Sequence, residues 1–233
     1  LEKFENNKIY SRENHQDKLT HLTYLTNCLN KNKKYKDSIA ASTKLKSSML
    51  EHDSFLENKF LFYYYNTNVA NYYALGDFSK ALNILKKANT NEVITKTPSF
   101  AAFIYMNQAL IYWKQKKFLM ASKNTSRLLL QEDFDLLDDS FQLNLRIFDL
   151  IMKTHIKDYE SIKNLIKVVK KNYKSLLDSN NYMMENDFVN LILKISDDSA
   201  LAKDFTSFVN RYKNLKKDYI ICYKEWIRDN YIQ

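Results

Sequence analysis

The sequence predicts an all-α protein of about five antiparallel helix pairs. The 233 residues include one glycine and one proline, which leaves almost none of the turn residues that strands and hairpins need. Apolar residues recur at helical spacing along most of the chain. Residues 60–88 have the pattern of two helices joined by a tight turn, and residues 101–128 are a looser copy. A repeated helix–turn–helix pattern is typical of helical repeat arrays.

The predicted helix pairs follow one another along one domain. Residues 1–15 are polar and are expected to be flexible, whereas residues 16–233 are expected to form a single repeat domain. The pairs are expected near residues 17–51, 57–89, 98–131, 138–177 and 181–230. Equivalent positions in the first four pairs are Ser38, Ala81, Ala121 and Ile162, which gives a period near 40 residues.

Small residues mark where the helices of the first two pairs cross closely. Ser38 and Ser42 lie on the second helix of the first pair, and Ala81 lies at the equivalent point of the next pair. Gly76, the single glycine, is expected to end the preceding helix in the left-handed conformation, which costs glycine little. Asp77 is then expected to cap the helix that follows.

Capping residues mark the later helix starts. Thr97 followed by Pro98 predicts the start of the third pair. The first helix of the fourth pair is expected to be capped by Asp138, Asp139 or Ser140, and acidic residues there also suit the positive end of the helix dipole.

The end of the chain predicts a long capping helix. Apolar residues recur at alternating spacings of 3 and 4 between Leu201 and Trp226, and Asp197 or Asp198 is available as the cap. An open-ended array needs such a helix to shield its last core face.

Residues 60–128 carry a family resemblance. Its first copy consists of Tyr65, Tyr72, Gly76, Phe78, Ala81, Leu85 and Ala88, and its second of Tyr105, Ala109, Tyr112, Phe118 and Ala121. This pattern resembles the tetratricopeptide repeat, although the period is longer than the family's 34 or so residues. The layout also resembles the C-terminal helical half of longer bacterial proteins of unassigned function. The resemblance implies a right-handed α-solenoid with a concave groove.

The resemblance further implies which side chains line that groove. The first helices of the pairs would contribute Thr23, Asn27, Asn30, Tyr63, Asn66, Ala70, Tyr73, Phe103, Met106, Leu110, Trp113, Asn144, Ile147 and Ile151. Aromatic rings anchor apolar groups of a partner, and amides can bond an extended peptide backbone. Alternatively, the longer helices curl the array tightly and these residues simply fill it.

The sequence predicts no catalytic, metal or cofactor site. His15, His21, His52 and His155 show no metal-site spacing with one another, with cysteine or with paired carboxylates. His155, next to a turn, is expected to interact with a helix dipole. A chain with one glycine has no glycine-rich phosphate loop, and no nucleophile motif is present. We therefore expect no enzyme.

The net charge of +9 is spread along the chain. One predicted helix carries a basic stripe, formed by Lys163, Lys167, Lys170, Lys171 and Lys174. A solvated outer face is the usual meaning of such a stripe. The alternative is an acidic partner, including a nucleic-acid backbone, whose binding would depend steeply on salt.

The leading hypothesis is a non-catalytic scaffold that binds a protein or peptide in the groove. A peptide-sensing regulatory arm of a larger signalling or transcription-control protein is an alternative, as is nucleic-acid binding. The aromatic residues also leave a homodimer open. The two distant cysteines favour a reducing, cytoplasmic compartment, and no apolar run is long enough for membrane insertion. The missing initiator Met is expected of a processed or excised chain.

Overall fold

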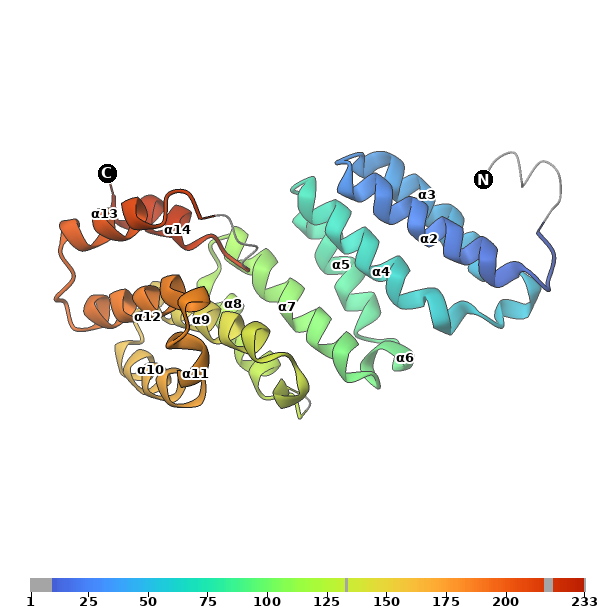
Figure 1. Cartoon of the computed structure of the whole chain (residues 1–233). Coiled ribbons are helices and arrows are strands. Elements are labelled where there is room, and N and C mark those ends of the chain that lie inside the picture. Colours follow the sequence, from blue (N-terminus) through green and yellow to red (C-terminus); the bar gives the residue numbers. More distant parts are fainter. Residues whose placement is uncertain (1–9, 133, 216–219, 233) are drawn as a thin grey trace. The chain divides into compact units, whose positions relative to one another are not determined.

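The computed structural model describes residues 10–132, 134–215 and 220–232, with only the backbone at positions 98, 99 and 101 (Figure 1). Every regular element in these ranges is a helix, which confirms the predicted all-α class. The α-helices are α2 (His15–Lys31), α3 (Tyr35–Met49), α4 (Glu57–Ala74), α5 (Phe78–Ala88), α6 (Glu92–Thr95), α7 (Pro98–Lys114), α8 (Phe118–Leu129), α9 (Asp139–His155), α10 (Tyr159–Asn172), α11 (Lys174–Leu177), α12 (Met183–Ser196), α13 (Ala202–Arg211) and α14 (Tyr223–Tyr231). Short 3-10 helices are η1 (His52–Ser54), η2 (Phe134–Leu136) and η3 (Asn180–Tyr182).

The chain divides within α7 into two compact units, Leu1–Ile111 and Tyr112–Gln233, which we call unit 1 and unit 2. The single domain predicted for residues 16–233 stays a prediction. Of the segment predicted to be flexible, residues 1–9 lie outside the described residues, and His15 is already the first residue of α2.

Five helices end in the same turn. One residue of each turn has a positive φ between 51° and 74°, and these residues are Lys33, Gly76, Lys116, Lys157 and Asp198. In each turn this residue's N–H bonds the carbonyl three positions back, and the next N–H bonds the carbonyl five positions back. This pattern is the Schellman motif. The turn residues lie 43, 40, 41 and 41 positions apart, in agreement with the predicted period.

The second helices of the first four pairs also repeat their buried positions. Residues 5, 9 and 12 positions after the turn residue are at most 2 % exposed: Ser38, Ser42 and Leu45; Ala81, Leu85 and Ala88; Ala121, Thr125 and Leu128; Ile162, Ile166 and Val169. The small residues therefore lie where the sequence predicts close helix crossings. The fifth pair departs from this register, because α13 begins only at Ala202.

Most of these turns lack the residue type that suits them. We expect Lys157→Gly to raise the free energy of unfolding by about 1 kcal/mol, because glycine takes a positive φ without the steric cost of a Cβ. Gly76→Ala should lower it by a similar amount, and through φ alone, because an added Cβ would meet no atom within 4 Å. Urea unfolding followed by circular dichroism measures both changes.

The matched control is Lys167→Gly, the same substitution at an exposed position inside α10. There glycine should lower stability by about 1 kcal/mol. A loss of stability in both lysine variants would contradict the assigned turn geometry.

Unit 1 has a polar chain of hydrogen bonds between its first three long helices. α2 packs on α3, α3 packs on α4, and α2 also contacts α4. Asn71 of α4 donates to Ser38 Oγ at 2.8 Å, and Ser38 donates to the carbonyl of Thr26 at 2.8 Å. Asn30 donates to Asn71 Oδ1, also at 2.8 Å. Because Asn71, Ser38 and Thr26 are 0 % exposed, these bonds satisfy polar atoms that water does not reach.

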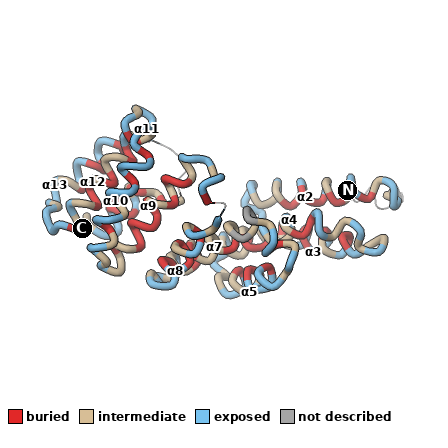
Figure 2. The backbone as a smooth tube through the Cα atoms, turned by 90° about the horizontal axis from the view of Figure 1, so that it is seen from below, coloured by how far each residue is buried: buried red, intermediate tan, exposed pale blue. Residues whose placement is uncertain are grey.

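Helix α9 forms the centre of unit 2. It packs against α8, α10 and α12, and buried residues follow it along most of its length (Figure 2). Asp138 caps it by accepting bonds from the N–H groups of Ser140 and Phe141, which confirms one of the predicted caps. Asp77 likewise caps α5, by accepting from the N–H of Lys80.

The prediction of one long C-terminal helix from Leu201 onward is wrong. Two helices, α13 and α14, take its place and pack against each other. Lys224 of α14 donates to the carbonyls of Tyr212 and Leu215, at 3.0 and 2.7 Å, so these backbone groups bond a side chain rather than a continuing helix. Of the apolar seam, Phe205, Phe208, Tyr212 and Trp226 are buried, whereas Leu201 and Leu215 are exposed. The buried members are divided between the two helices and the turn that follows α13.

The predicted cap at Asp197 or Asp198 is also wrong. Asp198 takes the left-handed position of the turn, and Asp197 pairs with Lys163 at 2.7 Å. At the start of α13, Asp204 instead accepts a bond from the N–H of Leu201 at 2.8 Å.

Candidate partner-binding cleft

A cleft of about 500 Å³ lies in unit 2. The cleft is lined by the C-terminal end of α7, the turn after it, the first residue of α8 and the last residue of α9. The other side is formed by α14 and the two residues before it. These residues are Trp113, Lys114, Lys116, Phe118, His155, Ile221, Cys222, Glu225, Trp226, Asp229 and Asn230. The volume is in the usual range of ligand pockets, and both tryptophans of the chain contribute to it.

Phe118 and Trp226 form an aromatic wall of the cleft, and both contact the His155 ring. The ring of Phe118 stacks on the imidazole with centroids 3.8 Å apart and planes within 3°. Trp226 stands at 89° to the imidazole and donates its Nε1–H to His155 Nε2 at 2.9 Å. Burial lowers the pKa of His155 to about 4, so the ring is neutral at physiological pH. His155 is the last residue of α9, as the sequence predicts, but its neutral ring brings no charge to the end of the helix dipole.

Charged groups of both signs line the same cleft. Lys114 places its Nζ 4.8 Å from the centroid of the Trp113 ring, a cation–π geometry. Lys116 is exposed, as are Glu225 and Asp229 from α14. An apolar wall with charged groups around it suits a peptide that inserts an apolar side chain and carries charges beside it.

In unit 1, the groove residues predicted on α4 and α7 are exposed or half-buried. Tyr63 is 44 % exposed, and Asn66 is exposed as well. Tyr73 is half-buried against Phe78, with ring centroids 5.8 Å apart. Phe103 is half-buried against Phe62 at 5.1 Å, and Met106, Ala70 and Leu110 are half-buried too.

In unit 2, the predicted groove residues have three different environments. Trp113 lines the cleft. Asn144 donates to the carbonyl of Ser140 at 2.8 Å and accepts from the Tyr223 hydroxyl at 3.0 Å, so its amide is bonded within the protein. Ile147 and Ile151 are 0 % exposed and belong to the core, which is the packing role that the alternative interpretation gives them.

The groove positions predicted on α2 are also engaged within unit 1. Thr23 is buried and donates to the carbonyl of Leu19 at 2.8 Å. Asn27 accepts from Thr67 at 3.3 Å, and Asn30 takes part in the polar chain described above. These side chains connect helices of unit 1.

The five lysines of the basic stripe are exposed on α10 and α11. Two of them have partners close by: Lys163 pairs with Asp197, and Lys170 donates to Asn190 Oδ1 at 2.7 Å. The positive charge of the stripe is therefore partly offset by its surroundings.

A buried carboxyl group lies on α9. Asp149 is 4 % exposed, and its Oδ1 has no hydrogen-bond partner among the residues that the structure describes. Burial raises its pKa to about 6, against the opposing charges of Lys153 and Arg146.

Of the residues that line the cleft, only Trp113 was predicted from the sequence as a binding residue. Trp226, Glu225 and Asp229 had been assigned to a capping helix, whereas the break before α14 turns them toward Trp113 and His155. The two tryptophans of the chain could have indicated this site, because tryptophan is enriched among the residues that dominate binding energy.

No protein-family model, curated protein or solved structure matches this chain. In the described part of the chain, every helix is too short or too polar to cross a bilayer.

Proposed function

We propose that this chain is a non-catalytic scaffold that binds a protein or peptide, with the cleft of unit 2 as its contact point. The observation that carries the proposal is the convergence of Trp113, Trp226 and Phe118 on one cleft with lysine and acidic groups around it. Aromatic anchors in a pocket, surrounded by polar residues, are typical of binding sites for protein partners.

The hydrogen bonding in the cleft supports a binding role over catalysis. His155 is the titratable ring of the wall, but its Nε2 accepts the Trp226 N–H and its pKa lies near 4. A general base must instead have a free nitrogen and a pKa near the working pH.

The five equivalent turns support an α-solenoid as the architecture of this scaffold. Stacked repeats bury one continuous core and present loops and helix ends along a surface. In such an arrangement, Tyr63, Asn66 and Tyr73 of unit 1 would be further partner contacts, and Phe103 and Met106 would support them.

Selection from a random peptide library against the immobilised chain tests the proposal. Peptides bound in the cleft should contain an apolar or aromatic residue with charged neighbours. They should also change the intrinsic tryptophan emission, because both tryptophans of the chain line the cleft. We expect Trp113→Ala to weaken binding by a factor of about 30 or more, as is usual for an aromatic hot spot worth at least about 2 kcal/mol.

Leu136→Ala is the matched control, because Leu136 is an 80 % exposed apolar residue of unit 2 outside the cleft. Affinity should be unchanged in this variant. Equal binding by the wild type and Trp113→Ala would contradict the cleft assignment. Loss of binding in a variant with Lys167 and Lys171 changed to Glu, with steep salt dependence, would point to the basic stripe and an acidic partner.

A further inference from the structure

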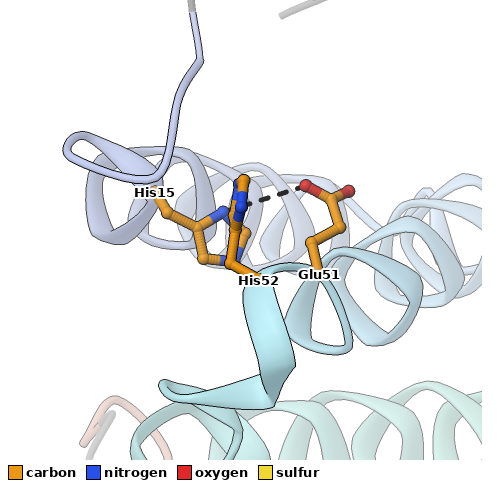
Figure 3. A group of neighbouring side chains, drawn as sticks. All are labelled: His15, Glu51 and His52. Atoms are coloured by element: carbon orange, nitrogen blue, oxygen red, sulfur yellow. Dashed lines mark ion pairs between the residues drawn. The ribbon is translucent and has the colours of Figure 1, made fainter.

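Three side chains with metal-binding atoms meet between the start of α2 and the connection from α3 to α4 (Figure 3). They are His15, the first residue of α2, and Glu51 and His52, which follow α3. One ligand atom from each lies within 4.8 Å of the others. His15 Nδ1 is 3.9 Å from Glu51 Oε2, and the two imidazole rings meet edge to face with centroids 4.8 Å apart.

His15 is the unusual member of this cluster. Its side chain is 1 % exposed. The backbone of Ser48 lies close to the ring, but neither ring nitrogen makes a hydrogen bond of good geometry with the described residues. Buried polar atoms in folded proteins are nearly always bonded, so a buried ring with such poor bonding requires an explanation. A ligand at this point would supply the missing partner.

The backbone places His52 in the cluster by a turn that few residues adopt. His52, Asp53 and Ser54 all have positive φ, at 52°, 63° and 58°. Consecutive left-handed residues other than glycine are rare, and such strain is concentrated at ligand-binding sites. This turn brings the His52 ring against His15 (Figure 3).

We propose that His15, Glu51 and His52 bind one divalent transition-metal ion of the Zn²⁺ type and that this ion fastens α2 to the connection between α3 and α4. Two imidazoles and one carboxylate are an established donor set for zinc, and a fourth position stays open for water or for a partner's side chain. The sequence predicted no metal site because His15 is far from Glu51 and His52 in the chain and the latter two are adjacent, a spacing unlike helical metal motifs.

Lys18 competes with the ion for the carboxylate. Its Nζ donates to Glu51 Oε1 and Oε2 at 2.8 and 3.0 Å. One oxygen would turn to the metal while the other keeps the lysine. Replacing Lys18 by Met removes this competing charge and should tighten metal binding several-fold.

Calorimetric titration of the full chain, freed of metal by a chelator, with ZnCl₂ tests the proposal. We expect one ion per chain, a higher Tm with the ion, and intense visible bands of four-coordinate Co²⁺ when CoCl₂ is used instead. Loss of a residue that only hydrogen-bonds a metal ligand weakens metal binding by roughly 10–100-fold. Because His52→Ala and Glu51→Gln each remove a ligand itself, each should weaken Zn²⁺ binding by more than that. These two residues are half-buried, so both variants should fold, whereas the fully buried His15 is left unchanged.

His21→Ala is the matched control, because His21 is an exposed histidine of the same helix outside the cluster. It should bind Zn²⁺ like the wild type. The proposal is overturned if the wild type shows no stoichiometric binding, if His52→Ala and Glu51→Gln bind as tightly as the wild type, or if His21→Ala loses binding to the same extent.

Discussion

Phe188→Ala is expected to lower the free energy of unfolding of unit 2 by about 3–5 kcal/mol, the usual cost of removing a buried phenylalanine. Phe188 of α12 is 0 % exposed. Its ring stacks on that of Tyr223 of α14, with centroids 4.3 Å apart. The ring centroids of Trp226 and Phe208 lie 5.5 and 5.7 Å from that of Phe188. The value should lie toward the upper end, because aromatic pairs add to the effect of burial.

Urea unfolding followed by tryptophan emission measures this change, since both tryptophans lie in unit 2. Phe188→Leu keeps most of the apolar volume and should cost much less. A loss below about 1 kcal/mol in Phe188→Ala would mean that α14 does not pack on α12 as described. Because Trp226 lies on α14, the alanine variant should also lose peptide binding in the cleft.

Asp149→Asn is expected to stabilise the protein by about 2–3 kcal/mol at pH 7 and above. The folded-state pKa of Asp149 is raised from 3.8 to about 6, and each pKa unit corresponds to about 1.4 kcal/mol. A carboxyl group with a raised pKa costs nothing below its unfolded pKa, and its cost grows as pH rises through the folded pKa. The gain in the variant should therefore vanish near pH 4 and be complete above pH 6.

Comparison of the urea midpoints of the wild type and Asp149→Asn across this range measures the gain. A gain that is the same at all pH values would come from packing rather than from the buried charge. His155 gives an internal check, because its pKa is lowered from 6.5 to about 4 and its contribution to stability is lost as pH falls through that window. His155→Phe should remove this acid sensitivity, about 1–2 kcal/mol after solvent screening, and make the opposite slope of Asp149 visible.

The fold class and the repeat could be predicted because they depend on local spacing. One glycine, apolar periodicity and the copies aligned on Ala81 and Ala121 were sufficient for the first four pairs. The turns at Lys33, Lys116, Lys157 and Asp198 were harder to predict. Their left-handed position is occupied by lysine or aspartate, which do not indicate a left-handed residue as glycine does. In the last pair, apolar spacing continues across a break, so periodicity alone joined two helices into one.

The sites were harder to predict because they depend on contacts between distant residues. Trp113 was identified from its place on a first helix, but its cleft needs His155 and Trp226, which lie far along the chain. Ile147 shows the opposite limit. Its helix position is equivalent to that of the exposed Asn66 and the half-buried Met106, yet in unit 2 the neighbours of α9 bury it completely.

The polar chain through Thr26, Ser38 and Asn71 has a consequence for the correct assembly of the repeats. Helices with the same apolar spacing can exchange places in a repeat protein, and such mispairing is a common route of misfolding. If α4 were replaced by a helix without an amide at this point, the Ser38 hydroxyl would lose its donor from Asn71, and the Asn30 amide its acceptor. Each buried group left unsatisfied would cost the wrong pairing about 1–3 kcal/mol, whereas apolar contacts of similar shape discriminate little between neighbours. The polar residues of the first pair therefore favour packing against α4 over packing against another helix of the array.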